Sequence, residues 1–439
     1  MGSAPAAVAP WRSVANVTLA ALFAMNLLNY IDRFILQALL RTVAKDPALN
    51  LDDSQSGVLV SAFFISYTLF SPIVGWFGDR LPRKRLLAVG VGVWSLATFG
   101  TGLAHSYGEI IFARSLLGIG EATYAVLTPS LISDLFPRSK RNTALTVFYL
   151  AIPIGAALGY GLGGGLNWLL GWRAAFYIVG LPGLAVAVAA LFLHEPARGA
   201  AEGVGEAERQ RFEALPLSWP LYATLLRNRS FVLNTLGMAL GAFALGGLQA
   251  WTPTYLAPGG EEDEVAHVGL WLGVVVAGSG FLGTALGWFS AERLGRRWQG
   301  AYFWVCGLST LAAAPFILLA LLARTELAVY AFMFLGLTLA FFNFGPANTI
   351  NVNVTSPKIR AAAVAVNLFL IHLLGDIPSP ALMGTVSDWL QRTGTVPKEA
   401  LFWAESVTLP ALLLSGLFFC LGARYLKGDQ EAVLREMRH

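Results

Sequence analysis

The sequence predicts an all-α membrane protein with 12 transmembrane helices in two pseudo-symmetric six-helix bundles. Three observations support this fold class: an apolar composition, twelve long apolar stretches and a loop motif that occurs twice. Of the 439 residues, 56% are hydrophobic and only 13% are charged, with a mean hydropathy of +0.61. Soluble globular proteins contain about 25% charged residues, so lipid must be the solvent for most of this chain.

Apolar stretches of about 20 residues, the length that crosses about 30 Å of hydrocarbon, recur along the whole chain. They are continuous, whereas the strands of a membrane barrel would be about ten residues long with alternating polarity, so we expect helices. The predicted spans lie near residues 14–40, 55–77, 84–104, 108–136, 141–166, 172–194, 230–256, 266–290, 297–323, 326–355, 358–388 and 398–427.

The positions of Lys and Arg predict the orientation of the spans, because cytoplasmic loops collect positive charge. With both termini in the cytoplasm, the inner segments hold 22 of the 30 basic residues, the outer loops hold six, and two, Arg33 and Arg114, lie within spans. The first 13 residues lack the pattern of a cleaved signal peptide, so we expect the first span to be retained. The pI of about 9.1 follows from this topology, and no basic patch with interleaved aromatic residues points to nucleic acid.

A polar segment at 195–229 divides six spans from six. We therefore expect an N-terminal bundle at 1–194, a cytoplasmic linker at 195–229, a C-terminal bundle at 230–427 and a cytoplasmic tail at 428–439. The linker and the tail are too short for an appended signalling or catalytic domain, which makes a membrane receptor or a membrane enzyme the weaker interpretation.

A loop motif is repeated in the two halves. The segment from Gly75 reads GWFGDRLPRKR, and the segment from Gly287, 212 residues later, reads GWFSAERLGRR. Both copies fall between the second and third spans of their half. The halves are therefore expected to be parallel repeats, related by an axis along the membrane normal.

This motif resembles the loop signature of the major facilitator superfamily, GxxxDRxGRKR, with Pro82 where Gly is usual and Glu292 one place out of register. The resemblance implies the major facilitator superfamily fold. Asp79 lies between two spans, where it can cap helix N–H groups and pair with Arg. We expect the motif to lock the cytoplasmic faces together in the outward-open state, although enforcement of topology is an alternative role for its basic residues. The predicted lock consists of Gly75, Asp79, Arg80, Arg83, Glu292 and Arg293.

Four charged residues lie deep inside predicted spans, where an ion is costly unless it faces protein or water. Asp32 and Arg33 are adjacent in the first span, and Arg114 and Glu121 lie two helical turns apart on one face of the fourth. Their depths match, which predicts one cluster of alternating charge in the wall of a central cavity. Asp32 and Arg33 diverge by about 100° around their helix, so they cannot both point down the cavity axis. A purely structural ion pair between the two spans is the alternative.

Two further spans contain unusual polar residues. His372 and Asp376 share one face of span eleven, before Pro378 and Pro380, which should break the helix. His372 could relay protons or be a satisfied histidine between helices. Four asparagines make span ten polar, either as cavity lining or, for the last two, as caps of its cytoplasmic end: Asn343, Asn348, Asn351 and Asn353.

Small residues on span five predict close helix packing. Gly155, Gly159 and Gly163 recur at four-residue steps, which forms a seam that allows another helix to approach closely.

No catalytic motif of the GxSxG, Walker A or HExxH type is present. Without a P-loop, transport cannot be driven by ATP hydrolysis on this chain, so we expect a secondary carrier that is not an enzyme and uses no cofactor. Cys306 and Cys420 lie in spans without CxxC or Cys/His spacing, so we expect packing residues and no metal site.

Three segments are similar to the Spinster family, which includes bacterial homologues of lysophospholipid and sphingosine-1-phosphate transporters. They are NYIDRF from Asn29, RSLLGIGEA from Arg114, and HLLGDIPSP from His372 with Gly384, Ser387 and Asp388 after it. The resemblance implies proton-coupled movement of an amphiphilic anionic lipid by alternating access. It implies a proton-coupling site formed by Asp32, Glu121, Arg33 and Arg114. We expect the substrate-binding residues to be Tyr30, Arg33, Arg114, Glu121, Asn343, His372 and Asp376.

A carrier of small organic anions, or a drug exporter, could use the same arginines and is the alternative function. Four aromatic residues could line the path of an acyl chain, or face lipid and core instead: Phe341, Phe342, Phe344 and Phe369. The expected partners are the substrate, protons and membrane lipids, with the chain acting as a monomer. Abundant Arg, Ala and Gly beside scarce Lys hint at a bacterial source, so we expect the bacterial inner membrane.

Overall fold

The computed structural model describes residues 10–78, 80–196, 225–298, 300–355 and 360–436. Within these ranges, 12 helices are long and apolar enough to cross a membrane, which confirms the predicted number and the all-α fold class. Each observed span begins and ends within six residues of its prediction. Most of the predicted linker, and Asp79 of the predicted lock, lie outside the described residues.

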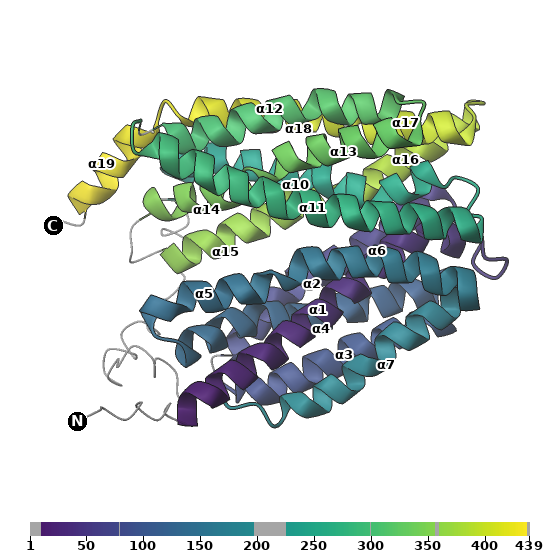
Figure 1. Ribbon diagram of the computed structural model, residues 1–439, viewed down its shortest axis with the longest axis horizontal. Coiled ribbons are helices and arrows are strands. Elements are labelled where there is room, and N and C mark those ends of the chain that lie inside the picture. Colours follow the sequence, from purple (N-terminus) through teal and green to yellow (C-terminus); the bar gives the residue numbers. More distant parts are fainter. Residues whose placement is uncertain (1–9, 79, 197–224, 299, 356–359, 437–439) are drawn as a thin grey trace, which may run out of the picture.

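The helices form two groups that lie one above the other in Figure 1. The first half contains α1 (Pro10–Ala44), α2 (Asp53–Gly78), α3 (Arg83–Leu103), α4 (Tyr107–Leu135), α5 (Arg138–Tyr149), α6 (Ala151–Leu170) and α7 (Trp172–Ala190). The second half contains α10 (Arg229–Leu256), α11 (Glu262–Gly295), α12 (Ala301–Leu322), α13 (Glu326–Phe341), α14 (Phe344–Asn353), α15 (Arg360–Ile371), the π turn η2 (His372–Asp376), α16 (Pro378–Arg392), α17 (Pro397–Ser406), α18 (Thr408–Gly422) and α19 (Leu426–Glu436).

Several spans consist of two helices because a proline interrupts the regular hydrogen-bond pattern. Span eleven was predicted to break at Pro378, and it does so through η2, where the Ile377 N–H bonds the His372 carbonyl oxygen. Span five is divided before Pro153 into α5 and α6 in a similar way. A proline lacks the N–H and its ring clashes with the preceding turn, so the neighbouring backbone must rearrange.

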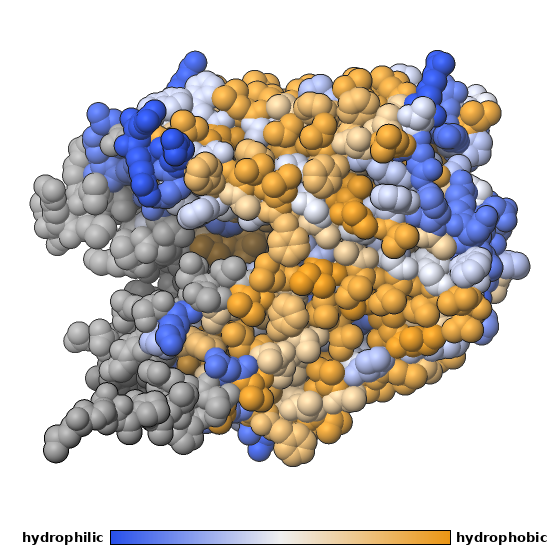
Figure 2. Space-filling model, viewed as in Figure 1, coloured by the Kyte–Doolittle hydropathy of each residue, from blue (hydrophilic) through white to orange (hydrophobic). Residues whose placement is uncertain are grey.

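The surface is that of a membrane protein. Figure 2 shows hydrophobic side chains over most of the visible face and hydrophilic side chains gathered at the two ends. Large apolar residues such as Leu69, Phe112 and Leu327 are more than half exposed, which is favourable only where lipid covers them. The chain is therefore an integral membrane protein.

Among the described residues, the two halves pack most closely toward one end of the molecule. The helix α1 begins and α19 ends at the same end of the molecule, at the left of Figure 1, which we call the terminal end; the opposite end is the far end. Toward the far end, α6 packs against α11 and α2 against α16. Figure 2 shows a hollow between the halves at the terminal end.

Glycines allow the far-end contact. A methyl group built on Gly57 would lie 2.2 Å from the Pro380 carbonyl oxygen, and one on Gly384 would lie 2.1 Å from that of Asp53. Only a residue without a side chain permits the two backbones to touch in this way.

The predicted glycine seam packs against α1. Built methyl groups on Gly155, Gly159 and Gly163 would meet the Cβ atoms of Tyr30, Phe34 and Ala38 at 2.6, 2.7 and 3.0 Å. The seam therefore holds the helix that carries Asp32 and Arg33 close to α6, and its prediction as a packing surface is confirmed.

Candidate functional site

The four charges predicted inside the membrane lie together between α1 and α4. Arg33 donates from Nη2 and Nε to Oε2 of Glu121, at 2.6 and 3.2 Å. Asp32 and Arg114 lie near enough to attract each other electrostatically, and each also interacts with Glu121. Two positive and two negative groups side by side offset part of the cost of removing each ion from water.

Arg33 is the member of this cluster that reaches open space. Its side chain is 17% exposed, whereas that of Glu121 is fully buried and Asp32 and Arg114 are almost so. Adjacent residues on a helix diverge by about 100°, and Asp32 accordingly points away from Arg33, toward Thr98 on α3. An anion entering the hollow would meet Arg33 before the other three charges.

Three aromatic rings surround the Arg33 guanidinium. Its Cζ lies 4.7 Å from the ring centre of Phe63, 4.9 Å from that of Tyr30 and 5.9 Å from that of Tyr67. Cation–π contacts of this kind hold a positive charge without neutralising it. Phe63 and Tyr67, both on α2, were not among the predicted site residues. Their i, i+4 spacing beside a predicted charge cluster was the signal that could have identified them.

His372 and Asp376 extend this network into the second half. The His372 Nδ1 lies 2.7 Å from Asp376 Oδ2, as their spacing predicted. The imidazole also packs against the rings of Tyr67 and Phe64 on α2, with centres 5.5 and 6.2 Å apart. Because Tyr67 also contacts Arg33, side chains connect the first-half charges with Asp376 across the two halves.

Asn343 lies apart from these residues. It is buried and donates from Nδ2 to the Thr310 hydroxyl on α12 at 3.4 Å, within the second half. Asn351 is likewise buried and accepts a 2.8 Å bond from Asn234 on α10. These contacts are those of polar residues that join neighbouring helices.

The described members of the predicted lock contact their own halves. Arg83 is buried and pairs with Asp134 at 2.6 Å and with Glu195 at 3.4 Å, which ties the start of α3 to α4 and to the segment after α7. Arg80 donates to the Trp76 carbonyl oxygen in the last turn of α2. A lock that acts between the halves is expected to be released while the terminal end is open, and these contacts fit such a state.

The far end carries a set of bonds between the halves that was not predicted, which we call the far-end latch. Asp388 on α16 accepts the backbone N–H groups of Asp53 at 3.1 Å and of Ser54 at 2.6 Å, the first two residues of α2. The Asp53 carboxylate accepts bonds from Arg41 at 3.1 Å, Ser387 at 2.6 Å and Gln391 at 2.7 Å. A helix of one half is thus capped by a carboxylate of the other.

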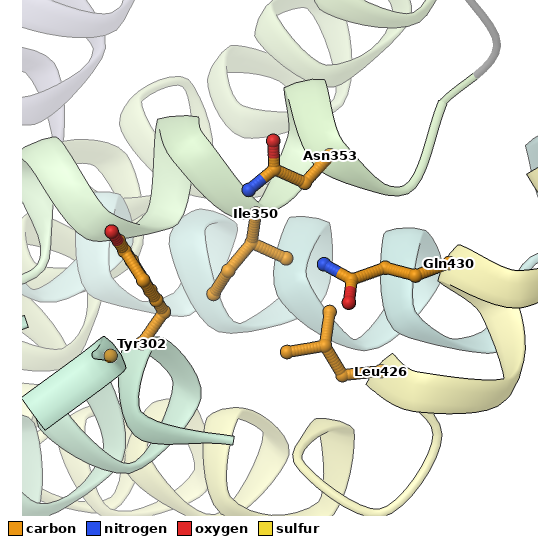
Figure 3. Close-up of a pocket in the computed structure, with 6 residues that line it drawn as sticks. Tyr302, Ile350, Asn353, Leu426 and Gln430 are labelled. Carbon is orange, nitrogen blue, oxygen red and sulfur yellow. The ribbon is translucent and has the colours of Figure 1, made fainter. Parts of the chain in front are cut away.

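A small pocket of about 160 Å³ lies at the terminal end of the second half, away from the charge cluster. Figure 3 shows the amide groups of Asn353 and Gln430 at its edge, above Ile350 and Leu426. Its lining contains no charged residue, so nothing there matches the anion chemistry of Arg33.

Comparison of the sequence and the fold with those of known proteins identifies the family of this chain. The family model for the Major Facilitator Superfamily matches residues 22–380. Human protein spinster homolog 1 is 36% identical over 410 residues, which cover 88% of this chain and 75% of the human protein. This chain belongs to the Spinster family. It is therefore a membrane transporter of the Major Facilitator Superfamily and not an enzyme.

Other Spinster relatives give the same result. Protein spinster of Drosophila melanogaster is 34% identical over 405 residues, and the chain covers 66% of that longer protein. A crystal structure of a bacterial homolog to the human lysosomal transporter Spinster, in an inward-facing and unoccupied conformation, matches with a TM-score of 0.79 at 24% identity and covers 98% of both chains. The occupied form of that homolog matches with a TM-score of 0.75.

Proposed function

We propose that this Spinster-family transporter moves an amphiphilic anionic lipid, of the lysophospholipid or sphingoid-phosphate class, by proton-coupled alternating access. The observation that supports this proposal most directly is the ion pair between Arg33 and Glu121, at the boundary between the buried charges and the hollow. The pair brings together an anion-binding group and a proton-accepting group.

Competition for Arg33 provides the coupling. While Glu121 is ionised, it accepts both Arg33 hydrogen bonds. A proton on Glu121 removes that charge and leaves the guanidinium free to bind a phosphate in the two-pronged geometry that Arg favours. Asp32, which interacts electrostatically with Arg114, provides a second carboxylate nearby. The states of the transporter then differ in their affinity for protons and substrate, which is what a coupled carrier requires.

The second half supplies the remaining polar contacts. His372 and Asp376 are partly exposed, and the His372 imidazole packs against Tyr67, one of the rings around Arg33. We assign them to the headgroup site together with Tyr30. Phe344 and Phe369 are exposed side chains on α14 and α15, where they are available to the apolar tail.

Flux into proteoliposomes tests the coupling. Asp32→Asn and Glu121→Gln should each weaken the dependence of lysophospholipid flux on an imposed pH gradient, whereas Glu399→Gln, an exposed residue at the far end, should not. Unchanged pH dependence in both cluster variants would remove these carboxylates from coupling.

Ligand-induced thermal stabilisation tests the substrate class. Lysolipids and sphingoid phosphates should raise the unfolding temperature of the wild-type chain, and Arg33→Ala should abolish the effect. Stabilisation by small water-soluble organic anions alone would favour the alternative carrier function.

A further inference from the structure

A carboxylate in the second half is buried, and no positive partner for it lies among the described residues. Glu405, near the end of α17, has no exposed surface, and neither of its carboxylate oxygens has a hydrogen-bond partner among the described residues. An isolated ionised carboxylate costs far more to bury than a neutral carboxyl group. In the conformation with a closed far end, Glu405 is therefore neutral and carries a proton.

The groups around Glu405 support this charge assignment. Three hydroxyl side chains lie near it: Thr252 and Tyr255 of α10, and Tyr160 of α6. Helix α17 also packs against α16 and α18. The ionisable residues at the far end of α16, Asp388 and Arg392, form no described ion pair with Glu405.

The site adjoins the contact between the two halves. The Tyr160 hydroxyl belongs to the first half and lies 2.9 Å from the Gln249 carbonyl oxygen of the second half. It also lies 3.2 Å from Gln37 Oε1 on α1. Opening the far end must separate Tyr160 from Gln249, which would expose the neighbourhood of Glu405 to water.

We propose that Glu405 is a second proton-binding site, in the half that lacks the four-charge cluster, and that its proton stabilises the closed far end. Glu405 lies eight residues into α17, or about 12 Å from the helix start, so it is reached from the far side. A proton that binds only in the closed state favours closure at low pH. Closure then weakens as the pH rises past the value at which Glu405 loses its proton. This inference does not depend on the identity of the substrate.

Distance measurements on the full chain in lipid nanodiscs, without substrate, test the proposal. Cys306 and Cys420 are replaced by Ser, and spin labels are placed at His105→Cys and Thr325→Cys, exposed far-end positions in opposite halves. The closed fraction should fall as the pH rises. In Glu405→Gln it should stay high, with a closed-to-open ratio at the alkaline limit at least about tenfold above that of the reference chain.

Three further measurements separate the proposal from its alternatives. In Asp32→Asn/Glu121→Gln, the Glu405-dependent titration should persist, so the proposed coupling site can fail without affecting this result. Glu405→Asp should retain a titration. Thr252→Val makes the surroundings of Glu405 less polar, which disfavours the ionised carboxylate, and should move the midpoint upward. This variant also serves as the test if Glu405→Gln does not fold.

A titration in Glu405→Gln identical to that of the reference chain would overturn the proposal. So would an unchanged midpoint in Thr252→Val, or an equilibrium that responds to sodium at constant pH and not to protons.

Discussion

Replacing Asp388 by Ala should shift the transporter toward an open far end. Asp388 accepts the N–H groups of Asp53 and Ser54 at 3.1 and 2.6 Å, and these bonds exist only while α2 and α16 are together. When the far end opens, water can bond the same groups. The substitution therefore removes stabilisation from the closed state alone.

The expected magnitude follows from the chemistry of helix N-termini. Loss of a capping side chain costs about 0.5–2 kcal/mol, and loss of a negative charge beside a helix N-terminus costs about 0.3–1 kcal/mol. We expect about 2 kcal/mol in total, which corresponds to a roughly 30-fold change in the ratio of closed to open far ends. Asp388→Asn, which keeps one acceptor oxygen, should have a smaller effect.

Spin-label distances across the far end measure this ratio. The matched control is Glu399→Ala, which removes a negative charge from an exposed position at the same end. The control should leave the distance distribution unchanged. Equal distributions in Asp388→Ala and Glu399→Ala would show that the far-end latch does not hold the halves together.

Three other substitutions test different parts of the structure. Gly384→Ala places a methyl group 2.1 Å from the Asp53 carbonyl oxygen and should oppose far-end closure by about 1–3 kcal/mol. Gly161→Ala, which has no neighbouring atom within 4 Å, should leave the spin-label distances across the far end unchanged. Arg83→Ala removes the buried cation that pairs with Asp134 and Glu195 and should lower the unfolding free energy by about 3 kcal/mol. Exposed Arg80→Ala is the control in thermal unfolding. Hydrogen bonds from Arg173 hold the pKa of Asp46, in the loop after α1, at about 2. Asp46→Asn should therefore lower the unfolding free energy by about 1 kcal/mol at neutral pH. The difference from wild type should shrink below a pH of about 4, the ordinary pKa of an Asp in the unfolded chain, and vanish as the pH falls through about 2. A difference that persists in acid would contradict this assignment.

Much of the fold could be predicted because a bilayer constrains a chain more strongly than water does. Span number follows from the length of apolar stretches, and the meeting of Arg33 and Glu121 follows from their matching depths. A charged residue at such a depth differs clearly from the apolar residues around it in the sequence. Charge, length and helical period therefore sufficed for the first-half cluster.

Contacts between the halves could not be predicted in the same way. The packing of Tyr67 on His372 depends on how α2 and η2 are rotated against each other, which no sequence period encodes. The far-end latch depends equally on the register between α2 and α16. Glu405 was missed because it lies near the start of a span, where a charged residue normally reaches water.

The glycine contacts at the far end also determine whether water can pass between the two halves there. Gly57 lies against the backbone at Pro380, and Gly384 against that at Asp53, with no room even for a methyl group. At these two positions backbone touches backbone, which leaves no space for a water molecule between α2 and α16. These two contacts therefore exclude water from the seam between α2 and α16, which would oppose a passive leak of protons along it.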